Sequence, residues 1–135
     1  MRDVIARLVR RIGRRGASLL FLALLDLIYA GGLLALPPEA RSNPSYAFLA
    51  RLLPLPIWAA IWGAVGLVCL VQAFARRDAL AFTAASLLKA AWGTVYLVGW
   101  ALGDIPRGWL ASVIWYGFAI WLAIISGWRE PDRSP

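Results

Sequence analysis

Two ionisable side chains, Asp26 and Lys89, lie inside long apolar stretches of the 135-residue sequence. An isolated charge in the middle of a bilayer costs about 2.5–3.5 kcal/mol, so each needs a partner, a change of protonation state or water. If both stretches are helices that start at the same membrane face, the two residues lie about 14 and 15 Å along them. This matched depth predicts an intramembrane ion pair, because pairing offsets both desolvation costs.

Two interpretations of the pair are open. As structure it is a clamp between helices, and as mechanism it is part of a proton or ion relay. Tyr29, three residues after Asp26, and Ser86, three residues before Lys89, are placed to supply further hydrogen bonds. The clamp is favoured, because a relay usually has more polar residues along the same helices.

The rest of the composition excludes several kinds of site. The chain has no histidine and one cysteine, which excludes a histidine-ligated metal, a Cys/His nucleophile pair and an internal disulfide. The loop charges Asp104 and Arg107 are few and mixed in sign. We therefore expect no enzyme activity, no cofactor and no bound metal, and Cys69 is interpreted as a small buried apolar residue.

The elements that position the pair are predicted membrane spans. Hydrophobic residues make up 61% of the chain and charged residues 16%, against about 45–50% and about 25% in soluble domains. Apolar windows of about 20 residues, the length that crosses a bilayer, occur at 17–36, 57–75, 79–102 and 109–128. The predicted fold class is all-α, a single integral membrane domain built as a four-helix bundle.

The first window also has the position of a secretory signal peptide. Its apolar run is long for such a peptide, and no convincing cleavage site follows, because Ala30, Gly31 and Gly32 lie inside the run. A permanent span is therefore expected.

The placement of arginine predicts the orientation of the spans. Of the 14 basic residues, six precede the first span, two lie between the second and third, and two follow the fourth, within the tail at 129–135. The loops on the opposite side hold three. Since basic residues of short loops stay in the cytoplasm, both termini are expected there, with the chain in a bacterial inner membrane.

The eight tryptophans fall into two groups. Indole rings favour the level of the lipid headgroups. Five of them lie at or near predicted span ends and are expected to form a belt there: Trp58, Trp62, Trp100, Trp109 and Trp128. Three lie nearer mid-span and are expected to pack between helices: Trp92, Trp115 and Trp121.

Residues 1–16 predict a basic amphipathic helix. Apolar residues follow helical spacing on one face: Val4, Ile5, Leu8, Val9 and Ile12. The other positions hold the arginines expected to contact lipid headgroups: Arg2, Arg7, Arg10, Arg11, Arg14 and Arg15. Six arginines less Asp3 give a charge of +5, which favours an anionic inner leaflet. Nucleic acid is the alternative partner, but neither interleaved aromatic residues nor a recognisable nucleic-acid-binding fold supports it, so none is expected.

The longest connection between spans contains a second short helix. Asn43 and Pro44 are typical of a helix start, and the apolar segment that follows predicts a helix over 44–53 that Pro54 ends. We expect it on the outer membrane interface. It is interpreted as a lid over the bundle, with a contact surface for an extracytoplasmic partner as the alternative.

Small residues at four-residue spacing predict close contacts between helices. The third and fourth spans carry the following set: Gly99, Gly103, Ala119, Ala123 and Gly127. The second span carries two overlapping pairs: Ala59 with Gly63, and Ala60 with Ala64. The facing helices can belong to the same chain, to a second copy in a homo-oligomer or to another membrane protein, and the sequence leaves this open.

In style the chain resembles small membrane proteins encoded by phages of GC-rich actinobacteria. The resemblance rests on four close spans, a basic entry at 10–16 that leads into the apolar run at 19–29, and near-exclusive use of arginine over lysine. Some of those proteins are holins, which open lesions in the host inner membrane that release or activate the lysis enzyme.

The resemblance implies holin-like membrane permeabilisation. The alternative is a structural or partner-binding membrane protein, such as an accessory subunit or a protein that excludes superinfecting phage. A small ion or proton conductor is a third interpretation.

Overall fold

The structure is a computed structural model that describes residues 1–127, apart from the side chain of Arg11. These residues form helices and no strand, which confirms the all-α prediction. The elements are α1 (Arg2–Leu34), the short η1 (Ala40–Ser42), α2 (Pro44–Leu52), α3 (Leu55–Gln72), α4 (Ala79–Ala101) and α5 (Gly108–Ser126). Trp128, the tail at 129–135 and the lipid contact predicted for Arg11 lie outside the described residues.

Four helical segments are long and apolar enough to cross a membrane: Ile12–Leu34, Leu55–Gln72, Ala79–Ala101 and Gly108–Ser126. Large apolar side chains on their outer faces are exposed, among them Ile28 at 65% and Ile120 at 61%. Contiguous apolar surface of this kind is unusual on a soluble monomer and is typical of a surface that meets lipid. The structure thus has the features of a multi-pass membrane protein.

The helix ends differ from the predicted windows by a few residues. α3 begins at Leu55 rather than at residue 57, because Pro56 fits the first turn, where a backbone N–H has no helical partner. It ends at Gln72 rather than at residue 75, because two backbone turns follow. The Gln72 side-chain oxygen accepts a hydrogen bond from the Ala81 backbone N–H (2.9 Å), which ties the α3–α4 connection to the start of α4.

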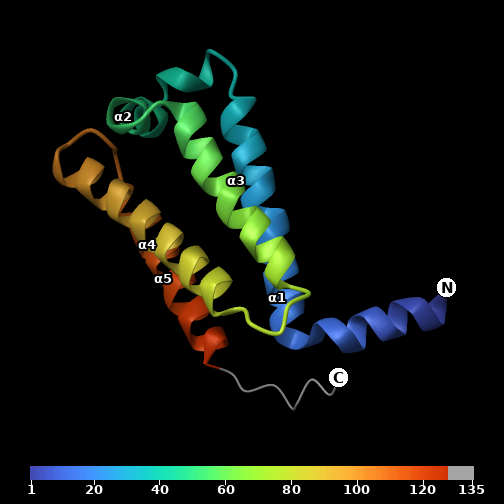
Figure 1. Cartoon of the computed structure of the whole chain (residues 1–135). Coiled ribbons are helices and arrows are strands. Elements are labelled where there is room, and N and C mark those ends of the chain that lie inside the picture. The colour runs from blue at the N-terminus through green and yellow to red at the C-terminus, as the bar shows by residue number, and fades with distance from the viewer. Residues whose placement is uncertain (128–135) are drawn as a thin grey trace.

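The predicted amphipathic helix and the first span are joined through Gly13. Its backbone has φ 66° and ψ −174°, an extended conformation with positive φ that glycine adopts at little cost. The chain changes direction there, and residues 2–12 project sideways from one end of the bundle (Figure 1). We call this segment the N-terminal arm. The end from which it projects, which also carries the α3–α4 connection and the end of α5, is called the basic end.

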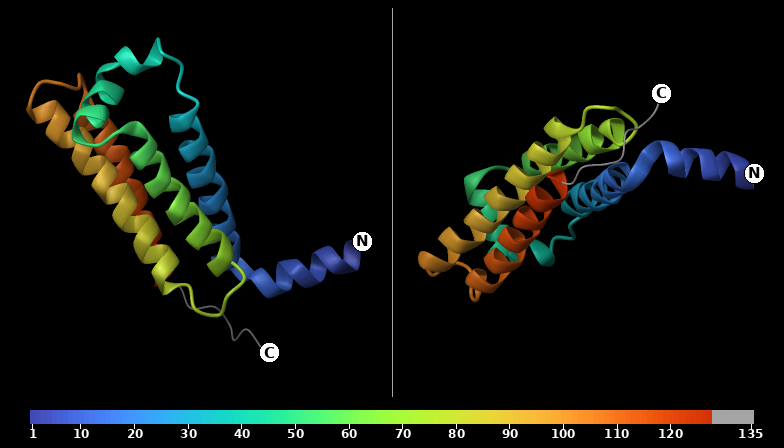
Figure 2. Two further views of the ribbon diagram at one scale, coloured as in Figure 1. Left: turned by 45° about the horizontal axis from the view of Figure 1, so that its top comes forward. Right: turned by 90° about the horizontal axis from the view of Figure 1, so that it is seen from below.

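The four long helices form two antiparallel pairs. α1 packs mainly on α3 and α4 packs mainly on α5, whereas contacts between the pairs are fewer and come chiefly from α3 with α4. Figures 1 and 2 show the two pairs side by side. We call the interface between them the seam.

Glycines allow the close approach within each pair. A Cβ atom on Gly66 of α3 would lie 2.9 Å from the Leu27 Cγ of α1, and one on Gly108 of α5 would lie 2.5 Å from the Tyr96 carbonyl oxygen of α4. Gly93 of α4 faces α5 at 3.3 Å in the same way.

The small residues singled out from the sequence only partly match these contacts. Gly99 and Ala119 are buried, and Gly99 accommodates the side chain of Ile105 from the α4–α5 connection. Gly103 does not pack against another helix of the described residues, because it follows α4 in a turn with φ 80° and open space around it. Ala123 and Gly127 are exposed.

α2 lies across the end of the bundle opposite the basic end. The Asn43 side chain accepts a hydrogen bond from the Ser45 N–H (3.0 Å), and Pro44 occupies the first turn, as the sequence predicts. Phe48 and Leu49 are buried beneath the helix. The Trp58 indole N–H donates to the Leu49 carbonyl oxygen (2.9 Å). This burial is what the lid interpretation requires.

Replacing Gly66 with alanine tests the contact between α1 and α3. The added Cβ would crowd Leu27, so we expect Gly66→Ala to lower the free energy of unfolding by about 1–3 kcal/mol, the usual cost of overpacking. Titration of the detergent-solubilised protein with sodium dodecyl sulfate, followed by tryptophan fluorescence, measures this change. The matched control is Gly117→Ala, where a Cβ meets nothing within 4 Å. An equal loss in both variants would contradict the packing.

Candidate functional site

The two charges that the sequence places at one depth meet at the seam. The Lys89 ammonium of α4 donates a hydrogen bond to the Asp26 carboxylate oxygen Oδ1 of α1. Both side chains are 0% exposed. Because α1 and α4 otherwise make few contacts, this ion pair is one of a small number of direct links between the two helices.

The ion pair lies between two apolar clusters. The cluster toward the basic end draws residues from all four long helices and includes Leu22, Cys69, Phe82 and Leu122. Cys69 is fully buried there, as expected from the sequence. The other cluster lies toward α2 and includes the fully buried Trp62. The pair is therefore enclosed by apolar side chains on both sides along the bundle.

Two aromatic rings flank the ammonium of the ion pair, Trp62 from the cluster toward α2 and Phe118, which packs on the cluster toward the basic end. The Lys89 Nζ lies 4.8 Å from the centroid of the Trp62 ring and 5.8 Å from that of the Phe118 ring. Both distances are within reach of a cation–π interaction. The ammonium thus has favourable contacts with the carboxylate and with two aromatic faces.

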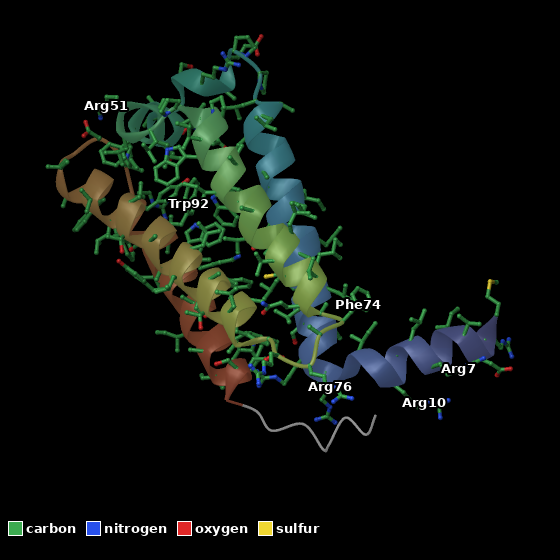
Figure 3. All side chains as sticks on the ribbon, viewed as in Figure 1. Arg7, Arg10, Arg51, Phe74, Arg76 and Trp92 are labelled. Atoms are coloured by element: carbon green, nitrogen blue, oxygen red, sulfur yellow. The ribbon has the colours of Figure 1, made fainter. Side chains whose placement is uncertain are left out.

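Trp62 belongs to a group of six rings that we call the aromatic cluster. The neighbouring rings within it have centroids 4.3–6.3 Å apart. Its members come from all four long helices: Tyr29, Trp58, Trp62, Trp92, Tyr96 and Trp115. Figure 3 shows Trp92 between the two helix pairs.

The prediction that Trp62 belongs to a headgroup belt is wrong. The Trp62 side chain points inward and is completely buried, in contact with aromatic rings of α1, α4 and α5. Trp92 and Trp115 pack between helices, as expected, whereas Trp121 is 51% exposed on the outer face of α5. Trp100 and Trp109 are also exposed, as a belt requires.

The prediction that Tyr29 and Ser86 support the ion pair is also wrong. Within the part of the chain that the structure describes, the second carboxylate oxygen of Asp26 has no hydrogen-bond partner. The Tyr29 ring packs instead on Trp62, with centroids 4.3 Å apart, because a step of three residues carries it one turn toward α2. The ion pair is consequently held by one direct hydrogen bond and by its apolar surroundings.

A second polar link lies at the basic end. The Arg15 guanidinium of α1 forms two hydrogen bonds with the Asp78 carboxylate, at 2.9 and 2.7 Å. It also donates to the carbonyl oxygens of Ile125 and Ser126 at the end of α5, where the helix dipole is negative. One side chain therefore ties α1 to the start of α4 and to the end of α5.

This arrangement corrects the lipid-contact role predicted for Arg15, whose side chain is only 15% exposed. Asp78, the acidic residue that directly follows Arg76 and Arg77, is the feature of the sequence that indicates a partner for Arg15. The other described arginines of this group, Arg2, Arg7, Arg10 and Arg14, are exposed.

In residues 1–127, no three His, Cys, Asp or Glu side chains gather closely enough to hold a metal ion. No protein-family model matches the chain, and no curated protein or solved structure is significantly similar to it. Function is therefore inferred from the contacts described above.

Removing one charge of the buried pair tests its coupling. Asp26→Leu leaves the Lys89 ammonium without its partner, and we expect a loss of about 3–5 kcal/mol in unfolding free energy, as for other broken buried pairs. The double variant Asp26→Leu/Lys89→Met removes both charges and should cost less than either single change. Detergent titration of the parent, Asp26→Leu, Lys89→Met and the double variant completes a double-mutant cycle. Additive losses would show that the two side chains are independent.

Arg15→Gln tests the second link. It removes the charge-assisted hydrogen bonds to Asp78 and to the end of α5, and we expect a loss of about 1.5–3 kcal/mol. The matched control is Arg14→Gln, because Arg14 is exposed and its replacement should leave stability nearly unchanged. Thermal inactivation of the solubilised protein compares the two, and similar losses would argue against the link.

Proposed function

We propose that the chain is a multi-pass protein of a bacterial inner membrane with both termini in the cytoplasm. The distribution of arginine over the two ends of the bundle supports this orientation. The basic end presents Arg2, Arg7 and Arg10 of the N-terminal arm together with the exposed Arg76 and Arg77. At the opposite end, Arg51 is paired with Asp104 at 3.0 Å.

We further propose that the protein permeabilises this membrane in the manner of a phage holin. The observation that carries the proposal is the position of Asp26 and Lys89 at the seam between two helix pairs, where contacts are fewer than within each pair. In the closed bundle the two charges neutralise each other. Separation of the pairs would turn one charge of each sign toward the bilayer.

Association with other opened chains lowers the energy of an opened chain. A single exposed charge in hydrocarbon is costly, but several chains that turn their seams toward a shared aqueous space hydrate those charges together. The energetic cost of separating the ion pair is therefore offset only in an assembly of several chains. Permeabilisation should therefore begin above a threshold abundance.

A structural or partner-binding role is the second candidate, and the links at the ends of the bundle favour it. Arg15 holds the basic end closed, and α2 covers the other end through buried Phe48 and Leu49. A bundle that stays closed keeps its charges paired and presents only its outer faces to a partner.

Inducible expression in a GC-rich actinobacterial host with a potential-sensitive dye separates the two functions. The parent chain is expected to collapse the membrane potential abruptly once its abundance passes a threshold. Asp26→Leu/Lys89→Met should insert to the same abundance without depolarisation, because its seam carries no charge to hydrate. The charge-swapped control, Asp26→Lys/Lys89→Asp, retains one charge of each sign and should depolarise.

Absence of depolarisation by the parent at high membrane abundance would contradict permeabilisation. Co-purification of the unaltered chain with another membrane protein would then favour the second candidate. Equal depolarisation by Asp26→Leu/Lys89→Met and by the parent would show that the charges at the seam take no part in permeabilisation.

A further inference from the structure

We propose that the N-terminal arm is a docking surface for anionic phospholipid and lies along the leaflet at the basic end. This inference rests on the membrane location proposed above. It adds a lipid partner to that location and depends on neither permeabilisation nor a closed bundle.

The arm has an apolar face that no other part of the described chain covers. Val4, Ile5, Leu8 and Val9 are 54%, 54%, 45% and 63% exposed. Exposed apolar residues of the spans have hydrocarbon beside them, but the arm projects sideways beyond the end of the bundle (Figures 1 and 3). Its apolar face therefore needs a different apolar environment, and the acyl boundary of a leaflet offers one.

The charge of the arm selects the kind of lipid. Arg2, Arg7 and Arg10 are exposed on it, and Arg14 is exposed directly after the bend. None of the ion pairs formed within residues 1–127 involves these four. Each basic residue near an anionic surface strengthens binding about fivefold, so phosphate headgroups with net negative charge suit this surface.

The bend at Gly13 gives the arm its direction. A straight continuation of the span would carry the arginines away from the headgroups, whereas the positive-φ backbone at Gly13 turns the helix aside. The span side of the bend is held in place by Arg15 and by Gly16, where a Cβ would lie 2.7 Å from the Ala73 carbonyl oxygen. The arm therefore leaves the bundle from a fixed point, at the same end as Arg76.

Other occupants of this surface fit the charges less well. A second copy of the arm would bring like charges together. Nucleic acid would satisfy the arginines but leave the apolar face in water. An anionic leaflet satisfies both faces of the helix at once.

A fluorescent label on the arm of the full chain tests the proposal. In a Cys69→Ala background, Val9→Cys carries an environment-sensitive fluorophore, and the protein is reconstituted in phosphatidylcholine vesicles with or without phosphatidylglycerol. We expect the label to be shielded from an aqueous quencher when phosphatidylglycerol is present and accessible when it is absent. Arg7→Gln/Arg10→Gln should weaken the docking about thirtyfold, seen as renewed access of the quencher.

Two controls separate the possible failures. Arg41→Gln removes an exposed arginine at the opposite end and should leave the shielding unchanged. A label at Ile28→Cys, on the exposed face of α1, should be shielded in both kinds of vesicle.

Each result has a definite meaning. An accessible Val9 label with a shielded Ile28 label in phosphatidylglycerol vesicles would overturn the lipid docking and leave the membrane location intact. Accessible labels at both positions would overturn the membrane location. Shielding at Val9 that follows protein density rather than phosphatidylglycerol content would assign the surface to a second copy of the chain and overturn the proposal.

Discussion

The hydrogen-bonded ion pair between Asp26 and Lys89 is the constraint on which the rest of the structure depends. Two opposite charges inside an apolar core have a low energy only in contact with each other. Their contact fixes the depth of α1 against that of α4, and with it the register of one helix pair on the other. Because both side chains are fully buried, sliding either pair along the other by one helical turn would leave two unpaired charges.

The remaining contacts are of two kinds: some stabilise the packing within each helix pair, and others hold the two pairs together across the seam. Close approach at Gly66 and Gly93 stabilises each pair internally and contributes nothing across the seam. Contacts across it include the ion pair, the aromatic cluster, the apolar packing of α3 on α4, the hydrogen bond between Gln72 and Ala81, and the hydrogen bonds of Arg15. Polar and aromatic contacts thus hold the two pairs together at the seam, whereas close approach at glycines stabilises the packing within each pair. In a bilayer this division is reasonable, because the hydrophobic effect does not drive helices together there.

Much of this arrangement follows from the sequence alone. Span length and turn residues predict the four long helices to within a few residues, and equal depth predicts which two charges can meet, because both depend on distance along the chain. The fates of Trp62 and Arg15 could not be predicted, since each depends on a segment distant in sequence. Trp62 is buried among aromatic rings that come from α1, α4 and α5. Arg15 is withdrawn from lipid by Asp78 and the end of α5. Tyr29 shows a third limit: a residue on the correct helix face can still lie one turn too far along it.

The aromatic cluster has a consequence for how the seam can be observed. Trp62 and Trp92 lie on opposite sides of it, with ring centroids 5.1 Å apart and planes at 87°. Aromatic side chains in fixed tertiary packing give a near-ultraviolet circular dichroism signal, which is lost when that packing is lost. The part of the signal that arises from ring contacts across the seam should be lost when the two helix pairs separate, and it needs no added label. Near-ultraviolet circular dichroism therefore reports on the separation of the two helix pairs.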